Sequence, residues 1–346
     1  DIITLHKNLA ELKKRNIDHV IIEASSHGLD QGRLDCLNFK AGIFTNFSQD
    51  HLDYHKTMKS YLKAKLNLFS KLLPNRSFII SDKELKEYSQ LKKISKKRNL
   101  NFLDINDEIN QIKSKSLPLI GSFQIKNLSM SVIAAKLCNL KKDEIYKHLN
   151  KIKNVNGRLD LIKKFPNNVR VFVDYAHTPD ALLAALSSLK EIYNKNISLV
   201  FGCGGERDFK KRPLMAKVAK KYSKKIYITD DNPRNENPSK IRKQITNHLK
   251  GANYFNIADR SLAIKKAIFN SEPNEIILIA GKGHENYQDY GKKIIKISDK
   301  TIVNKIKVKK NKIKIKDQNF LLNSKILKKI LKNKKSFRFN DITIDS

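Results

Sequence analysis

Apolar and polar segments alternate regularly over the second half of the chain. Short apolar runs, each the length of a buried strand, lie at 170–174, 197–201, 225–229 and 275–280. Longer segments with helical spacing of apolar residues lie at 180–192, 211–222, 239–250 and 261–270. Strands that alternate with helices in this way predict a parallel sheet. The expected fold class is therefore α/β, with a Rossmann-like, doubly wound domain in the second half.

The first half contains the same two kinds of element in a less regular order. Short strands are expected at 19–23, 41–44 and 77–81, and helices at 5–15, 83–98, 121–140 and 142–152. Asn156-Gly157 is a turn signal between the two patterns. We therefore place a domain boundary there, with a first domain over 1–155 and a second over 156–304.

Each expected strand of the second half is followed by a polar or glycine-rich segment. Because parallel strands place their carboxyl ends on one edge of the sheet, these segments are expected to converge on one site. Their charged residues suit a zwitterion, since guanidinium groups bind carboxylates and carboxylates accept from ammonium groups. These residues are Arg207, Asp231, Arg234 and Glu285. A single charged loop is more often solvated surface, and the convergence of four favours a site. The run from Gly202 to Gly205 lacks the G-x-G-x-x-G spacing of a dinucleotide site.

A loop between residues 44 and 55 carries a dense set of possible metal ligands and proton-transfer groups, namely Asp50, His51, Asp53 and His55. In the helical stretch that follows, Lys65 interrupts an apolar stripe formed by Met58, Leu62, Phe69 and Leu72. One interpretation is that the stem of Lys65 packs while its ammonium group reaches water. The other is that Lys65 is partly desolvated and favours the neutral amine, which can act as a nucleophile or be carbamylated by CO2. A carbamate there would supply an anionic oxygen for Mg2+.

The strand expected at 19–23 ends on a second polar segment, which runs from Glu23 through Ser25 and His27 to Gln31 and Arg33. A carboxylate followed by hydroxyls, an imidazole and a glycine suits phosphate and Mg2+ handling at the carboxyl end of a strand. A polar turn with a helix-capping serine would explain the same residues, so both interpretations stay open at this point.

The net charge of +36 in 346 residues raises the question of nucleic acid. The lysines are spread along the whole chain without the interleaved aromatic residues of a stacking platform, so we expect solvated surface lysine and no nucleic-acid partner. This charge can still steer an anionic substrate. Three distant cysteines, Cys36, Cys138 and Cys203, favour a reducing cytoplasmic setting without a disulfide framework. No apolar run is long enough to span a membrane.

Both ends of the sequence look cut, since it begins with Asp1 rather than Met and ends in a short segment. Residues 305–319 form a basic, low-complexity run that is typical of a linker. Residues 320–346 have the pattern of a helix and a first strand, which is too short for a domain.

Six ordered motifs together resemble those of the Mur ligases, in particular the members that add diaminopimelate. The motifs begin at Glu23, Thr45, Asn156, Asp174, Asp231 and Gly281, and the resemblance covers about residues 1 to 305. It implies an ATP-dependent, amide-bond-forming ligase of cytoplasmic peptidoglycan synthesis. Such an enzyme forms an acyl phosphate on the D-glutamate side chain of UDP-MurNAc-L-Ala-D-Glu, and the amino group of meso-diaminopimelate attacks it.

The resemblance also implies residue roles. Glu23, His51 and a carbamylated Lys65 would act in catalysis and hold Mg2+, and ATP would bind at Asn46, Arg158 and Asp174. The UDP-MurNAc-dipeptide would contact Ser25, Gln31 and Arg33. The meso-diaminopimelate site would consist of Arg207, Asp231, Asn232, Pro233, Arg234, Gly281 and Glu285. Arg234 is the discriminating residue, since lysine-adding relatives tend to lack it.

Departures from the family pattern qualify this expectation. The family usually has Asn where this chain has Gln124, and Ser and Asp where it has Asn235 and Asn237. No G-x-x-x-x-G-K-[ST] phosphate loop occurs, and the uridine-binding domain is missing. We therefore expect an incomplete central P-loop-type ATPase domain, and a chain that is inactive by itself. The tail resembles the start of the D-alanyl-D-alanine-adding ligase, which suggests a fused pair of ligases.

Three alternatives remain at this stage. A lysine-adding Mur ligase would share the reaction, and a folylpolyglutamate-synthetase-like ligase would share the ATPase half. The folate-type enzyme would not need the Asp231-Asn232-Pro233-Arg234 loop or the loop from Gly281 to Glu285. A basic nucleic-acid-binding protein would explain the charge alone, and its affinity would fall steeply with salt.

Overall fold

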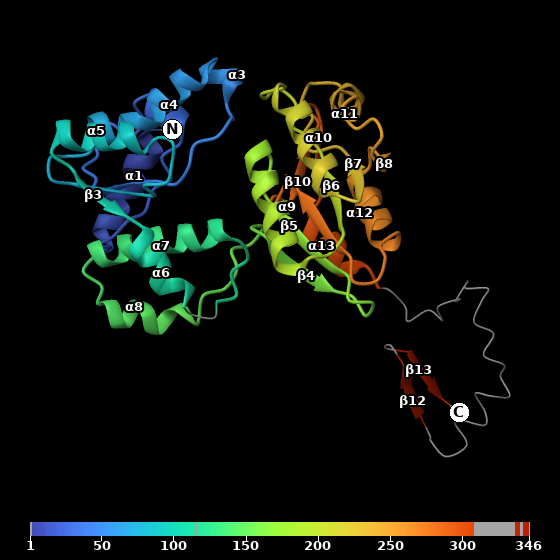
Figure 1. Ribbon diagram of the computed structural model, residues 1–346. Helices are drawn as coiled ribbons and strands as arrows, with labels where there is room; N and C mark the ends of the chain where they lie inside the picture. The colour runs from blue at the N-terminus through green and yellow to red at the C-terminus, as the bar shows by residue number, and fades with distance from the viewer. Residues whose placement is uncertain (1, 115–116, 308–335, 340–341, 346) are drawn as a thin grey trace.

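The computed structural model describes residues 2–114, 117–307, 336–339 and 342–345. Two α/β halves lie side by side, joined at about residue 155, and a small hairpin lies apart from both (Figure 1). No helix in these ranges is both long and apolar enough to cross a membrane. The α/β class expected from the alternating pattern is confirmed.

The second half is built on a sheet with the strand order β4-β5-β9-β6-β7-β8. Its strands are β4 (Asp160–Lys164), β5 (Arg170–Asp174), β6 (Ile197–Phe201), β7 (Lys225–Ile228), β8 (Tyr254–Asn256) and β9 (Ile276–Ala280). All neighbours pair in parallel except β4, which is antiparallel to β5. Its helices are α9 (Pro179–Tyr193), α10 (Lys211–Tyr222), α11 (Pro238–Thr246), α12 (Arg260–Phe269) and α13 (Asp299–Lys305). The predicted doubly wound domain is confirmed.

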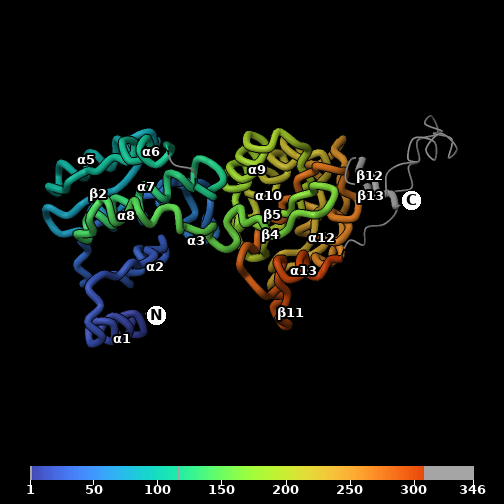
Figure 2. Tube along the Cα trace, turned by 90° about the horizontal axis from the view of Figure 1, so that it is seen from below, coloured from blue at the N-terminus to red at the C-terminus, as the bar shows by residue number. Residues whose placement is uncertain are grey.

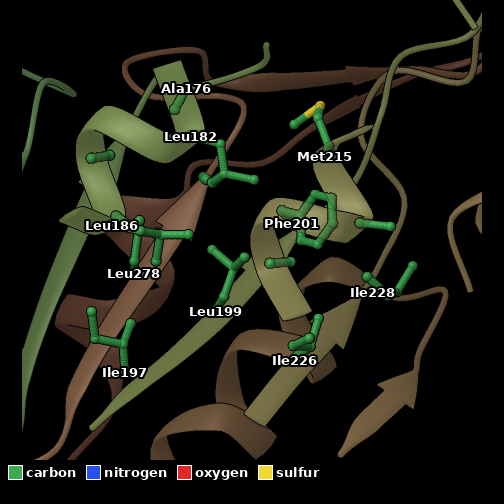
Figure 3. Packing of buried hydrophobic residues seen from close by; sticks show 14 of the residues in the cluster. Ala176, Leu182, Leu186, Ile197, Leu199, Phe201, Met215, Ile226, Ile228 and Leu278 are labelled. Atoms are coloured by element: carbon green, nitrogen blue, oxygen red, sulfur yellow. The ribbon is translucent and has the colours of Figure 1, made fainter. Parts of the chain in front are cut away.

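Helices cover both faces of this sheet, and each face has its own core. On one face, α9, α10 and α11 pack their apolar residues on side chains such as Leu199, Phe201 and Leu278 (Figure 3). On the other face, α12 and α13 pack on alternate residues of the same strands, such as Val200 and Ile279. Because every residue of β6 and β9 is buried, these strands appear in the sequence as continuous apolar runs. Each fully buried aliphatic side chain stabilises the fold by about 1.5–3 kcal/mol.

A buried ion pair ties α12 to α13 beneath this sheet. The Arg260 guanidinium donates from Nε to Asp299 Oδ1 at 2.8 Å and from Nη2 to Asp299 Oδ2 at 2.7 Å. Nη2 also donates to the carbonyl of Ala280 at 3.1 Å. Both charged side chains are at most 1% exposed. The pair fixes α13 against the carboxyl end of β9, where the polar loops begin.

Asp299→Ala is expected to lower the free energy of unfolding by about 3–5 kcal/mol, because it leaves the Arg260 charge buried without its partner. Urea unfolding followed by circular dichroism measures this loss. Lys224→Ala is a matched control, since it removes an ion pair to Glu272 in which both side chains are largely exposed, and it should leave the unfolding midpoint unchanged. Equal midpoints for the two variants would contradict the assignment.

The first half contains a parallel sheet of three strands in the order β1-β2-β3. These are β1 (Ala41–Phe44), β2 (Phe78–Ser81) and β3 (Asn101–Asp104). Its helices are α1 (Ile2–Lys14), α2 (Ser26–Asp30), α3 (Leu52–His55), α4 (Met58–Asn67), α5 (Tyr88–Arg98), α6 (Asn106–Lys113), α7 (Ser122–Leu137) and α8 (Lys142–Leu149), with a π-helical turn η1 (Leu68–Leu72) after α4. Buried residues of α2, α4, η1 and α5 form one cluster, and those of α6 and α7 another around Ile80.

The strand predicted at 19–23 is wrong. These residues pair with no strand in the structure, and Ile21 is 92% exposed. The helix α1 before them has no buried residue and lies to one side of the first half (Figure 2), where Leu5 packs against the core of that half. An apolar run forms a buried strand only where it pairs with a neighbouring strand and is covered by a helix. Among the described residues, no strand pairs with the free edge of β1.

Several short elements were not predicted. These are β3, α6, β4, β8, α13 and a hairpin of β10 (Tyr287–Asp289) and β11 (Ile294–Lys296). The helix predicted at 83–98 begins only at Tyr88. The helical stretch predicted after residue 55 is divided into α4 and η1, and the short helix α3 lies before it, within the loop. Lys65 lies at the edge of the buried face that Tyr61, Ala64 and Phe69 form.

The end of the chain is described only in part. The predicted basic linker over 305–319 and the predicted helix after residue 320 lie almost entirely outside the described residues. Beyond them, β12 (Ser336–Phe339) and β13 (Ile342–Asp345) pair as an antiparallel hairpin. The resemblance of this tail to a second ligase remains a prediction.

Candidate active site

One loop of the first half reaches across to the loops of the second. Gln49 Nε2 donates to Asp208 Oδ2 at 2.8 Å, and Arg207 lies 3.8 Å from Asp53. Asp50 meets His177 at 3.3 Å through one carboxylate oxygen and Lys211 at 3.4 Å through the other. The loop that the sequence marked as dense in metal ligands therefore faces the carboxyl ends of β5 and β6. Polar side chains of the two halves are therefore in direct contact.

The carboxylate of Asp50 is the centre of this contact. Burial by itself would raise its pKa, but the hydrogen bond to His177 and the charges of Lys211 and His51 hold the pKa well below its ordinary value. The Lys211 side chain is only 5% exposed, and its ammonium group has no other ion-pair partner among the described residues. Removing Asp50 would leave that charge buried and unpaired.

Asp50→Ala is expected to loosen the contact between the halves. Loss of a hydrogen-bonded charge pair costs about 1.5–3 kcal/mol, so the equilibrium constant for local opening should rise by about tenfold or more. Hydrogen–deuterium exchange of the peptides around 49–53 and 207–211 measures this effect. Asp53→Ala is the control, because the contact of Asp53 to Arg207 is longer and more exposed. Faster exchange in the control than in Asp50→Ala would contradict this assignment.

Lys65 lies on α4 behind this loop and is half-buried. Burial lowers the pKa of its ammonium group, although the negative charges of Asp50 and Glu23 oppose the shift. Its Nζ lies 5.4 Å from the centre of the Tyr61 ring. Burial also raises the pKa of Tyr61 to about 12, which keeps that phenol neutral at physiological pH. Of the two interpretations of Lys65, partial desolvation agrees with this environment, and its carbamylation remains a prediction.

The residues expected to contact the dipeptide substrate surround the short helix α2. Ser25 caps this helix by accepting a hydrogen bond from the Gly28 N–H at 3.1 Å, so the capping role that the sequence left open is present. Gln31, at the other end, donates to the Tyr54 hydroxyl at 3.3 Å. Ser25, Gln31 and Arg33 are all exposed. The ring of His27, on α2, lies 4.9 Å from the ring of His51 in the metal-ligand loop.

The residues expected to bind ATP come from both halves. Asn46 is exposed just after β1. Arg158 stacks on the Tyr175 ring with its guanidinium carbon 4.5 Å from the ring centre, and its carbonyl accepts from Gln124 at 3.0 Å. The Asp174 carboxylate is buried and accepts the N–H groups of its own neighbourhood, Leu159 at 2.6 Å and Ala176 at 2.7 Å. Burial raises its pKa despite these bonds. Asp174 thus fixes the position of the Arg158 loop.

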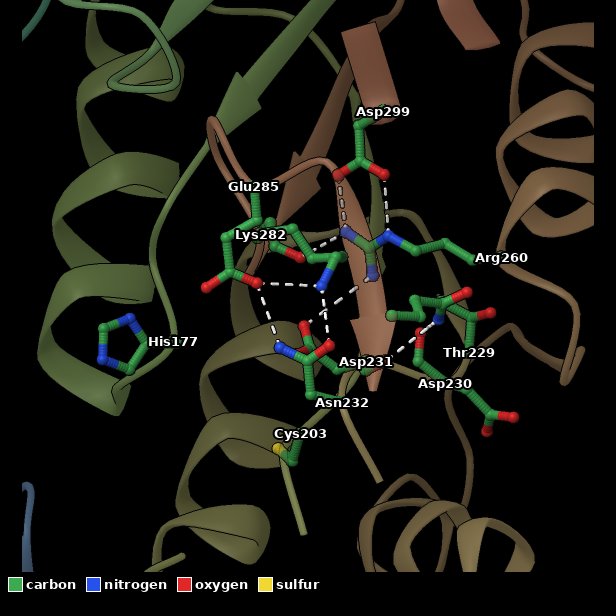
Figure 4. A network of polar contacts seen from close by, with 12 residues as sticks. His177, Cys203, Thr229, Asp230, Asp231, Asn232, Arg260, Lys282, Glu285 and Asp299 are labelled. Atoms are coloured by element: carbon green, nitrogen blue, oxygen red, sulfur yellow. Dashed lines mark hydrogen bonds and ion pairs between the residues drawn. The ribbon is translucent and has the colours of Figure 1, made fainter. Parts of the chain in front are cut away.

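The residues expected to bind the amino acid converge at the ends of β7 and β9. Lys282 points between Asn232 and Glu285 and donates to both at 2.9 Å (Figure 4). Asn232 Nδ2 donates to the same Glu285 oxygen at 3.0 Å. Burial by itself would raise the pKa of Glu285, but the bonds from Lys282 and Asn232 and the charge of Lys282 keep it below its ordinary value. The Glu285 carboxylate is therefore held ionised at the edge of the sheet.

Arg234 has an unusual backbone. Its φ is +53°, a left-handed conformation that residues other than glycine and asparagine rarely adopt. Its N–H donates to the carbonyl of Asp289 at 2.9 Å, and its guanidinium donates to the carbonyl of Gly205 at 2.8 Å. A side chain at Gly205 would collide with the Pro233 carbonyl, which its Cβ would approach to 1.9 Å. This close packing brings the Gly205 carbonyl within hydrogen-bonding distance of the Arg234 guanidinium.

Asp231 lies deeper than the sequence suggested. Its carboxylate sits against Gly281, where an added Cβ would come within 2.6 Å of Oδ2. That oxygen has no hydrogen-bond partner among the described residues, and the nearest charge is Arg260 Nη1 at 4.0 Å. Asp231, Asn232 and Gly281 are therefore buried at the base of the site, while Arg234 and Glu285 are partly exposed at its rim and Arg207 lies toward the first half.

No group of three or more His, Cys, Asp or Glu side chains is placed to hold a metal ion within the described ranges. The expected metal set is one carboxylate, one imidazole and a carbamate, namely Glu23, His51 and Lys65. Two of these three groups would supply the oxygen ligands that Mg2+ prefers, and Mg2+ is usually bound through few protein groups. The set depends on the carbamate, because Lys65 as an ammonium group cannot coordinate a cation.

Sequence reasoning missed three residues that organise the site. Lys282 was part of a motif but had no role, and neither Lys211 nor Tyr175 was singled out. The position of Lys282 between two glycines was a signal, since flanking glycines allow a loop to bring a side chain inward. Nothing in the sequence indicated that Lys211 would meet Asp50, because that contact joins separate domains.

Two family models match the chain. The Mur ligase middle domain matches residues 1–135, and the Mur ligase glutamate ligase domain matches residues 157–283. The chain belongs to the Mur ligase family, a class of ATP-dependent ligases. The expectation from the six motifs is confirmed at this level.

The relatives place the chain more narrowly within that class. It is 41% identical over 329 residues to the UDP-N-acetylmuramoyl-L-alanyl-D-glutamate–2,6-diaminopimelate ligase of Rickettsia montanensis, with 88% of this chain and 68% of that protein covered. It is 35% identical to the ligase of the same name from Rhizobium meliloti (strain 1021), with 88% and 67% covered. The chain thus spans about two thirds of the length of these relatives.

A solved structure supports the fold. The folylpolyglutamate synthase of Mycobacterium tuberculosis superposes with a TM-score of 0.58 at 15% identity, covering 72% of this chain and 62% of that one. An identity this low is evidence for the shared fold alone.

Proposed function

We propose that this chain forms the middle and C-terminal parts, 1–155 and 156–304, of a ligase that adds meso-diaminopimelate to UDP-MurNAc-L-Ala-D-Glu. The observation that carries the proposal is a chain of contacts between the two halves. Asn232 binds Glu285, Glu285 accepts from Tyr175, the Tyr175 ring packs on His177, and His177 meets Asp50 of the first half. An amino-acid site then lies opposite a phosphate-activating one. The names of the relatives at 41% and 35% identity support the same substrates.

The rim matches the chemistry of diaminopimelate. This amino acid carries a second carboxylate and ammonium pair at the far end of its side chain. A guanidinium group binds a carboxylate through two parallel hydrogen bonds. A lysine substrate has no carboxylate at the end of its side chain and could not form them. The ionised Glu285 would accept from an ammonium group, with Asn232 and Lys282 fixing its orientation. Arg207 would complete the site from the side of the first half.

The other half would activate the acceptor carboxylate. ATP would bind at Asn46, Arg158 and Asp174, and Ser25, Gln31 and Arg33 would hold the dipeptide substrate. Mg2+ held by Glu23, His51 and carbamylated Lys65 would neutralise phosphate charge. The Arg158 guanidinium would bind phosphate oxygens from the second half, and the contact of Asp50 with His177 and Lys211 would keep the reacting groups together.

An ADP-release assay on the full-length protein tests this function. With UDP-MurNAc-L-Ala-D-Glu present, release should be stimulated by meso-diaminopimelate and not by L-lysine. Stimulation by lysine alone would retain the ligase and overturn the amino acid. Release only with a folate acceptor and glutamate would favour the folylpolyglutamate-type alternative.

A further inference from the structure

Tyr175 occupies the junction of three loops. It follows β5 directly, and its side chain is half-buried. The Arg158 guanidinium lies on its ring at 4.5 Å, and its hydroxyl donates to Glu285 Oε1 at 3.3 Å. Arg158 belongs to the proposed nucleotide site and Glu285 to the proposed amino-acid site. One side chain therefore contacts a member of each site.

The loops around Tyr175 are packed too closely to move separately. A Cβ on Gly157, next to Arg158, would come within 2.5 Å of the His284 nitrogen, next to Glu285. A Cβ on Gly283 would come within 2.8 Å of the Tyr175 Cβ. The ring of His284 lies 5.6 Å from that of Tyr175. A displacement at Arg158 is consequently passed to the loop that holds Glu285.

A third contact extends toward the first half. The ring of His177 lies edge-on to that of Tyr175, with 4.7 Å between the ring centres, and His177 Nε2 reaches Asp50. Tyr175 thus contacts the residue that links the two halves as well as one residue of each ligand site.

We propose that Tyr175 is a positioning residue that couples nucleotide binding at Arg158 to amino-acid binding at Glu285. The inference rests on the proposed roles of these two residues. A nucleotide phosphate that fixes the Arg158 guanidinium also fixes the aromatic ring beneath it, and the ring carries the hydroxyl that orients Glu285. The amino acid then meets a carboxylate that is already oriented. By linkage, the amino acid tightens nucleotide binding by the same factor.

The test measures the affinity of the full-length protein for meso-diaminopimelate, with and without a saturating non-hydrolysable ATP analogue. The ratio of the two dissociation constants is the coupling factor. Couplings of this kind are typically about 5- to 150-fold. We expect a factor in this range for the wild type, and a factor near one for Tyr175→Phe, which keeps the ring but loses the hydroxyl. Tyr175→Phe should also weaken nucleotide binding when the amino acid is present, because the coupling is reciprocal, while nucleotide affinity without the amino acid stays unchanged.

Two further variants separate coupling from structure. Tyr175→Leu also loses the ring, so it should raise both KM values. Tyr193→Leu is the matched control, because Tyr193 carries Arg170 over its ring at 5.2 Å at a distance from both sites. It should retain the wild-type coupling factor. If Tyr175→Leu fails to fold, Tyr175→Phe still decides the question.

The outcomes distinguish this inference from the function on which it rests. A wild type that ligates diaminopimelate but has a coupling factor of one overturns the inference, as does a Tyr175→Phe variant with the wild-type factor. A wild type that releases no ADP with any amino acid overturns the proposed function itself.

Discussion

Lys65→Ala is expected to lower kcat for amide formation by about 10²–10³-fold, the loss typical of removing one preorganised electrostatic group from an active site. Lys65 is half-buried, and burial lowers the pKa of its ammonium group, which favours the neutral amine that a carbamate requires. The KM for diaminopimelate should change little, because Lys65 lies in the other half of the molecule. Steady-state ADP release with all three substrates measures both constants.

Lys63→Ala supplies the matched control. Lys63 lies on the same helix but is exposed, and its removal should leave kcat unchanged. Lys65→Arg keeps a positive charge but cannot be carbamylated, so it should be as defective as Lys65→Ala. Near-wild-type turnover in the arginine variant would mean that Lys65 acts as a cation. That result would contradict the proposed role of carbamylated Lys65 as a metal ligand.

Arg234→Ala is expected to raise the KM for meso-diaminopimelate by about 10- to 100-fold, which corresponds to losing a charge-assisted hydrogen-bond pair. The change in kcat should be smaller, since in the proposed role Arg234 would contact the far end of the amino acid rather than the reacting amine. Discrimination against L-lysine should fall by a similar factor. Parallel kinetics with the two amino acids measure both effects.

Arg234→Lys separates charge from geometry. A lysine keeps the charge but cannot form the two parallel bonds of a guanidinium group, so most of the loss should remain. Unchanged use of diaminopimelate by Arg234→Ala would remove the amino-acid assignment while leaving the ligase class intact.

The sequence predicted those elements that are buried by contacts within their own domain. The runs at 197–201 and 275–280 became β6 and β9, because both lie in the middle of the sheet and are buried on both faces. By contrast, β8 is three residues long and exposed at the edge, so it leaves no apolar pattern. The segment 19–23 shows the opposite error. Its apolar pattern predicts a strand, but the segment has no neighbouring strand to pair with.

The candidate site was predictable where chemistry followed a strand end. Asp231, Arg234 and Glu285 were identified because parallel strands place their carboxyl ends together. The contacts of Asp50 with His177 and Lys211 were not, because they depend on how two domains meet. Residue spacing within one domain carries no information about that arrangement.

The left-handed backbone at Arg234 has a consequence for random mutagenesis of the protein. At most positions, a substitution that abolishes function leaves open whether folding or recognition failed. Here the native φ of +53° suits glycine and asparagine better than arginine. Arg234→Gly should relieve the strained backbone, which offsets the loss of the guanidinium bond to the Gly205 carbonyl, so the variant should still fold while losing the proposed amino-acid contact. A genetic screen that recovers inactive but abundant protein with glycine at this position would report on substrate recognition alone.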